Sequence, residues 1–105
     1  MSFDEAQQDV DQWTSQFDPQ YWDPHEMLAR LAEEVGELGR EVNHAYGPKP
    51  KKDGSSFNVE EELVDIMFTV ICFANKEGID LDEAWSTMIS QKLEVRDKDR
   101  FDDAS

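Results

Sequence analysis

The segment 63–74 constrains the fold of this chain more than any other, because every residue in it is apolar except Asp65 and Thr69. Asn58 and Gly78 flank it and are typical residues for the start and the end of a helix. A helix with apolar side chains around its whole circumference must be buried on all sides. A chain of 105 residues can hardly bury such a helix alone, so the sequence predicts a homodimer or homotetramer.

The remaining sequence predicts three further helices and no β-strand. The first begins at a capping box of Ser2 and Glu5, and one side of it is apolar, formed by Phe3, Ala6, Val10, Trp13 and Phe17. The expected fold class is therefore all-α, a four-helix subunit whose bundle core is completed by oligomerisation. We expect a single domain spanning residues 1–105.

The second and fourth helices also have clear start signals. Asp23 is a good N-cap before Pro24, and the helix is predicted to end near Tyr46, where Gly47 follows. Leu28, Leu31, Val35, Leu38 and Val42 give it an apolar stripe. The fourth helix is expected from Asp80 to about Lys98, with a frayed tail after it, and residues 47–57 form a loop with three lysines.

The net charge of −15 excludes some partners. An acidic chain repels nucleic-acid backbones and anionic membranes, so we expect no nucleic acid polymer and no membrane as partners. Cys72, the single cysteine, lies in the apolar segment and indicates a reducing compartment. With no signal-peptide pattern at the start, we expect a cytoplasmic protein.

Acidic residues recur at helical spacing in the second and third helices. Glu34 and Glu37 lie on one flank of the apolar stripe, and Glu62 and Asp65 form a second pair three residues apart. If the two helices pack antiparallel, four carboxylates can converge, and such hard oxygen ligands suit Mg²⁺ or Mn²⁺. A solvated acidic flank is the alternative for the first pair. An isolated charge on Asp65 would be costly in an apolar run unless a cation or a proton compensates it.

Two cations lie on the apolar side of the fourth helix. Lys92 and Arg96 are four residues apart, within the same arc as Trp85, Met88 and Ile89. They suggest a bound anion such as a phosphate, which a metal ion and cations together would hold. The alternative is that their stems cover apolar surface, or that they pair with the acidic helices.

The run Glu33-Glu34-Val35-Gly36-Glu37, followed by Glu62-Leu63-Val64-Asp65, resembles the EExxE…ExxD motif of the MazG-like all-α nucleoside triphosphate pyrophosphohydrolases. The short chain with Lys92 and Arg96 near its end is most similar to the compact single-domain bacterial members. The resemblance implies a helical dimer, or a tetramer built from dimers. It also implies Mg²⁺-dependent hydrolysis of an NTP or dNTP to the monophosphate and pyrophosphate, as in nucleotide housecleaning.

The resemblance also implies roles for individual residues. Glu34, Glu37, Glu62 and Asp65 match the metal ligands, and Glu33 matches the first motif glutamate, which holds another metal or orients the attacking water. Lys92 and Arg96 match positions that face the phosphates. The base pocket would involve Trp22, Asn43 and His44, although Trp22 can equally be a core or interface aromatic. The alternative of a different class is a non-catalytic, metal-stabilised helical oligomer that acts as a binding or regulatory module.

Overall fold

The protein is all-helical, as the sequence predicts, and the computed structural model describes residues 2–47 and 58–96. No strand occurs in these two ranges, and no helix within them is long and apolar enough to cross a membrane. The elements in chain order are α1 (Phe3–Thr14), α2 (Pro24–Tyr46), α3 (Val59–Glu77), α4 (Leu81–Thr87) and the π-helical η1 (Met88–Arg96).

Local capping determines where these helices begin. Asp23 accepts a hydrogen bond from the backbone N–H of Glu26 at 2.9 Å, and this bond lowers the pKa of the Asp23 carboxyl. The side chains of Ser2, Asn58 and Asp80 cap the other α-helices in the same way. The predicted starts of all four helices are thereby confirmed, and so is the end of α3 at Gly78.

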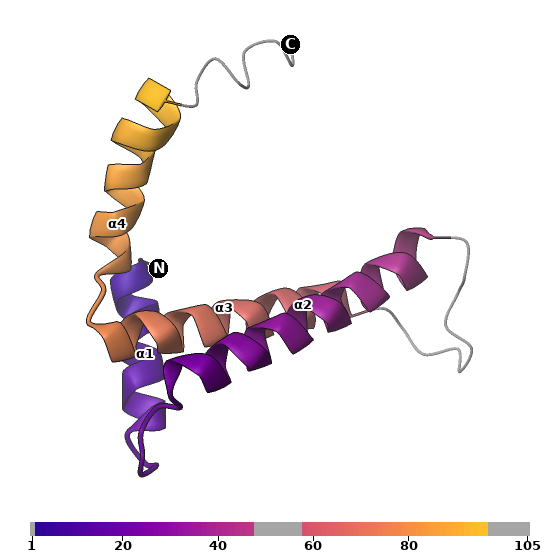
Figure 1. Cartoon of the computed structure of the whole chain (residues 1–105), viewed down its shortest axis with the longest axis horizontal. Coiled ribbons are helices and arrows are strands. Elements are labelled where there is room, and N and C mark those ends of the chain that lie inside the picture. The colour runs from indigo at the N-terminus through magenta and orange to yellow at the C-terminus, as the bar shows by residue number, and fades with distance from the viewer. Residues whose placement is uncertain (1, 48–57, 97–105) are drawn as a thin grey trace.

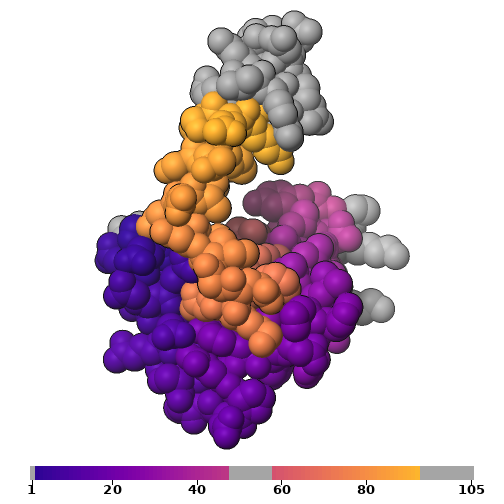
Figure 2. Space-filling view, turned by 60° about the vertical axis from the view of Figure 1, so that its left-hand side comes forward, coloured from indigo at the N-terminus to yellow at the C-terminus, as the bar shows by residue number. Residues whose placement is uncertain are grey.

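The helices α2 and α3 form an antiparallel hairpin, and α1 crosses the end of it where α3 leads into α4 (Figure 1). The Asp82 carboxylate accepts hydrogen bonds from the backbone N–H groups of Phe3 (3.1 Å) and Asp4 (3.0 Å), and the rings of Phe3 and Trp85 are 5.5 Å apart. These contacts attach α4 to α1. The arm formed by α4 and η1 therefore projects from the body of the subunit (Figure 2).

The fourth helix differs from the prediction in its second half. Its first part is α-helical, but from Met88 onward the helix adopts the wider π form. Its predicted end near Lys98 and the tail after it lie outside the described residues, as does the lysine-containing loop of residues 48–57.

The core of the single chain is small. Val10, Met27, Ile71 and Cys72 form its buried cluster, at the crossing of α1 with the hairpin. Burial raises the pKa of the Cys72 thiol to about 11, which agrees with an unreactive core cysteine.

Large apolar side chains remain exposed along the hairpin, as expected if a further surface is to cover them. On α3, Val64 is 58% exposed and Met67 51%. The apolar stripe of α2 is divided, because Leu31 and Leu38 are half-buried while Leu28, Val35 and Val42 are exposed. Large apolar side chains on both α2 and α3, which we call together the apolar side of the hairpin, are thus uncovered in the single chain.

The C-terminal cap of α3 provides a test of the fold. Gly78 has a φ of 70°, which costs other residues about 1 kcal/mol or more. A Cβ on Gly78 would meet no atom within 4 Å, so strain of the backbone alone should make Gly78→Ala less stable. Gly39, inside α2, has equally open surroundings, and Gly39→Ala should instead be more stable by roughly 0.5–1 kcal/mol. Urea unfolding midpoints measure both changes, and a Gly78→Ala variant as stable as the wild type would refute the cap.

Candidate active site

Carboxylates line the seam between α2 and α3, and we call this row the acid seam: Glu34, Glu37 and Glu41 from α2, with Glu62 and Asp65 from α3. The antiparallel pairing fixes its two ends. At one end the Thr69 hydroxyl donates a hydrogen bond to Glu34 Oε1. At the other end the backbone N–H of Asn58 donates to Glu41 Oε2 at 3.1 Å. The other carboxylates lie between these two contacts.

Glu62 is the least favourably placed carboxylate of the acid seam. Burial is the largest cause that raises the pKa of its carboxyl, followed by the negative charges of Glu37, Asp65 and Glu41. Its Oε2 atom is buried and has no hydrogen-bond partner among the described residues. A raised carboxyl pKa means that the ionised form is disfavoured in the folded protein, so a cation beside Glu62 would stabilise the fold.

The acid seam fits a divalent metal ion by the chemistry of its donors. Carboxylate oxygens are the ligands that Mg²⁺ and Mn²⁺ prefer. The Glu62 Oε2 atom accepts no hydrogen bond among the described residues, so it is available as a metal ligand. In the described ranges no group of three or more His, Cys, Asp or Glu side chains is already gathered as a metal site. Glu37, Glu62 and Asp65 are the group whose mutual repulsion an ion would relieve.

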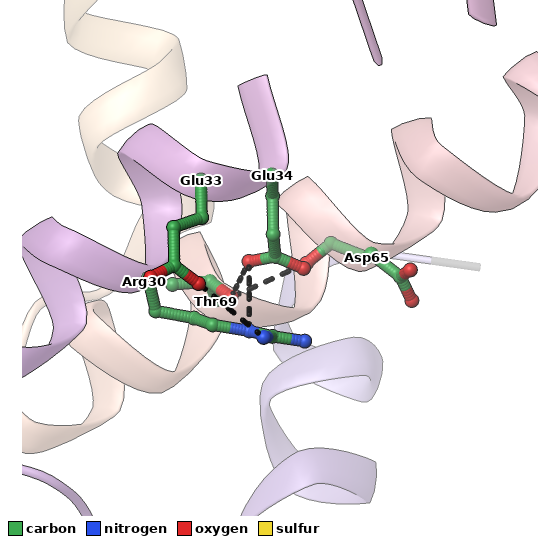
Figure 3. Close-up of polar contacts among 5 residues, drawn as sticks. All are labelled: Arg30, Glu33, Glu34, Asp65 and Thr69. Carbon is green, nitrogen blue, oxygen red and sulfur yellow. Dashed lines mark hydrogen bonds and ion pairs between the residues drawn. The ribbon is translucent and has the colours of Figure 1, made fainter. Parts of the chain in front are cut away.

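Glu34 differs from the other carboxylates, because it is only 3% exposed and has defined partners. Besides the hydrogen bond from Thr69, its Oε1 atom lies 3.9 Å from Arg30 Nε. The neighbouring Glu33 is exposed, and its Oε2 atom lies 3.8 Å from Arg30 Nη1. Figure 3 shows both glutamates directed at the Arg30 guanidinium, with the Asp65 carboxylate turned away from Glu34. The motif carboxylates thus belong to two different environments.

A cavity of about 650 Å³ lies beside the acid seam, between α1, the link of residues 17–22, α2 and α3. We call it the aromatic cavity, since its lining includes the rings of Trp13, Phe17, Tyr21, Trp22 and Phe68. Arg30, Glu34 and Asp65 also line it. The Tyr21 hydroxyl donates to Asp11 Oδ1 at 2.8 Å and accepts from Asn75 Nδ2 at 3.1 Å, which fixes this part of the wall to α1 and α3. Cavities of this size and character hold small organic ligands.

The remaining predicted site residues are placed apart from the aromatic cavity. Asn43 and His44 lie in the last turn of α2 and are not among its lining residues. The half-buried His44 has no hydrogen-bond partner for its Nδ1 atom in the described part of the chain. Lys92 is exposed on η1, in the arm that projects from the body (Figure 2). Arg96 ends η1, and its side chain lies outside the described residues. Of the predicted base-contacting residues, Trp22 alone lines the cavity.

Two residues of the site were not singled out from the sequence. Arg30 lies four positions before Glu34, a helical spacing that predicts an ion pair. Thr69 lies four positions after Asp65 and is, with it, a polar interruption of the apolar segment. Both signals were present in the sequence, but only the pairing of α2 with α3 shows that Thr69 and Arg30 meet at the same carboxylate.

Comparison with known proteins agrees with the motif. Residues 23–101 match the model of the MazG nucleotide pyrophosphohydrolase domain. The chain is 46% identical over 98 residues to YpjD of Bacillus subtilis (strain 168), an uncharacterized protein, covering 92% of this chain and 87% of YpjD.

Two crystal structures have the same fold. That of YpjD from Bacillus subtilis has a TM-score of 0.76 at 43% identity, over 85% of this chain and 92% of that one. That of a Bacillus-conserved MazG protein, a nucleotide pyrophosphohydrolase, has a TM-score of 0.78 at 42% identity, over 94% of this chain and 96% of that one.

The crowding at Glu62 leads to a prediction about metal-free and metal-loaded protein. Without metal, Glu62→Gln should melt at the same temperature as the wild type or higher, because the change removes one of several repelling charges. Mg²⁺ should raise the melting temperature of the wild type and have a much smaller effect on Glu62→Gln. Glu60→Gln, an exposed change two residues earlier on α3, is the matched control and should keep the wild-type response. An equal response of all three proteins to Mg²⁺ would exclude Glu62 as a metal ligand.

Proposed function

The chain belongs to the MazG nucleotide pyrophosphohydrolase family and is thus a hydrolase, and from this we propose that it is a Mg²⁺-dependent enzyme that cleaves an NTP or dNTP to the monophosphate and pyrophosphate. One observation supports this most directly. The aromatic cavity and the acid seam share Glu34 and Asp65 as lining residues. A flat apolar group and a polyphosphate on the same molecule would therefore fit side by side.

The aromatic cavity is the proposed site of the base. Its volume of about 650 Å³ exceeds that of any single base, and its rings offer faces for stacking, which favours every base to a similar degree. Trp22 is 53% exposed, so its ring is accessible and is not part of the core. Stacking alone does not select one base, so all the common NTPs and dNTPs are candidate substrates.

The acid seam is the proposed site of the phosphates. Glu37, Glu62 and Asp65 would hold the metal, with Glu34 beside them. These carboxylates would hold the ion beside the polyphosphate, where it would supply positive charge against the negative charge that develops during cleavage. Glu33 is exposed next to Arg30, and its proposed role is to orient the attacking water. The alternative is that Glu33 binds a second metal ion.

A second copy of the chain is the proposed cover for the apolar side of the hairpin. Each large apolar side chain left in water forgoes roughly 1.5–3 kcal/mol of burial, and contiguous patches of this kind mark interfaces. Two hairpins packed through this side would form a four-helix bundle. Lys92 is exposed on the projecting arm, so in an assembly it can approach the acid seam of another subunit.

A nucleotide panel tests the activity. With Mg²⁺, we expect at least one NTP or dNTP to yield equal amounts of monophosphate and pyrophosphate without orthophosphate. Glu37→Gln and Asp65→Asn keep the shape of the side chain but lose its charge, and should lower turnover by at least about 100-fold while remaining folded. Full turnover in excess chelator, or by either variant, would contradict the metal site.

Light scattering at low micromolar concentration tests the assembly. We expect a particle of twice or four times the 12.1 kDa of one chain. Met67→Lys inserts a charge into the apolar side of the hairpin and should dissociate this particle or destabilise the chain. Gln12→Lys adds the same charge on the exposed outer part of α1 and should leave the mass unchanged. A stable, active wild-type monomer would refute the proposal.

A further inference from the structure

Arg30 lies where the aromatic cavity meets the acid seam. It lines the cavity together with Glu34 and Asp65, and it precedes Glu34 by about one turn of α2. Figure 3 shows its side chain extended beneath Glu33 and Glu34. Along α2 the order is therefore Met27 in the cavity wall, Arg30 and Glu34 at the transition, and Glu37 in the seam.

The guanidinium of Arg30 lies beside two carboxylates but keeps its hydrogen-bond donors available. Its two ion pairs measure 3.8 Å to Glu33 and 3.9 Å to Glu34, and both are too long for hydrogen bonds. Arginine has five N–H donors, and in the described part of the chain none of those of Arg30 makes a hydrogen bond. The side chain is 46% exposed, so a ligand in the cavity can approach these donors.

The anchor of this arginine is itself fixed. Glu34 is 3% exposed and accepts the hydrogen bond of the Thr69 hydroxyl, so its carboxylate is positioned by a contact that does not involve Arg30. Thr69 also lines the cavity. Buried, hydrogen-bonded Glu34 thus places a fixed negative charge beside Arg30 before any ligand arrives, and fixed charges of this kind are what transition-state stabilisation requires.

We propose that Arg30 binds the α-phosphate of the nucleotide, the phosphate next to the sugar, and is a catalytic residue. This inference depends on the proposed function. In this arrangement the base of the nucleotide lies in the aromatic cavity and its outer phosphates lie at Glu37 and Glu62. Its first phosphate then lies beside the Arg30 guanidinium. Guanidinium groups bind two phosphate oxygens at once with good geometry.

The proposed contact acts on the atom at which the bond breaks. Formation of pyrophosphate and a monophosphate requires that the oxygen of water bonds to the α-phosphorus. The bond from that phosphorus to the oxygen bridging the α- and β-phosphates then breaks, and pyrophosphate leaves with the electron pair. The proton of the water passes to a carboxylate. Arg30 stabilises the negative charge on the two non-bridging α-oxygens throughout this step.

Binding measurements without catalysis test the contact. The probes are the four deoxynucleosides and their 5′-monophosphates, titrated calorimetrically in EDTA, and inorganic pyrophosphate, titrated with Mg²⁺. Arg30→Gln should weaken monophosphate binding by about tenfold or more while nucleoside and pyrophosphate binding stay unchanged. Arg30→Lys, which keeps the charge without the fork, should restore binding in part. Arg40→Gln, an exposed change on the same helix outside the cavity lining, is the matched control.

Other outcomes overturn the inference in distinguishable ways. If Arg30→Gln weakens nucleosides and monophosphates equally, Arg30 only shapes the cavity. If it lowers the melting temperature but leaves monophosphate affinity unchanged, Arg30 only compensates the charge of Glu34. In turnover assays we expect Arg30→Gln to lower kcat, and an unchanged kcat would also refute the proposal. Failure of the proposed function would appear separately, as a wild-type protein that hydrolyses no nucleotide in the panel.

Discussion

The antiparallel pairing of α2 with α3 is the interaction on which the site depends. It places glutamates of one helix opposite carboxylates and polar groups of the other, from Glu34 with Thr69 at one end to Glu41 with Asn58 at the other. Repulsion between the carboxylates opposes this arrangement, as the raised pKa of Glu62 indicates. Negative charge is therefore concentrated in the hairpin where a cation and a polyphosphate would bind. Apolar contacts elsewhere must hold the two helices together.

Those apolar contacts are few within one subunit. The buried cluster lies at the crossing of α1 with the hairpin, whereas the side of α3 that includes Val64 and Met67 is exposed. The projecting arm also has few contacts with the rest of the chain: it is attached to α1 through Asp82 and Trp85. A single chain thus has its carboxylates and its cavity assembled, whereas the exposed apolar side chains of the hairpin would be covered by the proposed second copy.

The sequence alone predicted the helices well, because each begins at a side chain that can cap it and α3 ends at a glycine. It also identified the carboxylates of the seam, since Glu34, Glu37, Glu62 and Asp65 recur at helical spacing.

The sequence did not predict the aromatic cavity. Trp13 and Phe17 lie far from Phe68 in the chain, and their meeting depends on the angle at which α1 crosses the hairpin. The burial of Glu34 was missed for the same reason, because its partner Thr69 is on another helix. The π-helical form of η1 has no counterpart in the residue pattern from which the fourth helix was predicted.

In the proposed reaction, the cavity and the acid seam together direct water to the α-phosphorus of a nucleotide. Hydrolysis of the preferred substrate in water enriched in oxygen-18, followed by mass spectrometry of both products, tests this most directly. The arrangement of Arg30 between the cavity and the seam predicts that the label enters the nucleoside monophosphate and is absent from pyrophosphate. Label in pyrophosphate would mean attack on the β-phosphorus and would refute the proposed position of the α-phosphate at Arg30.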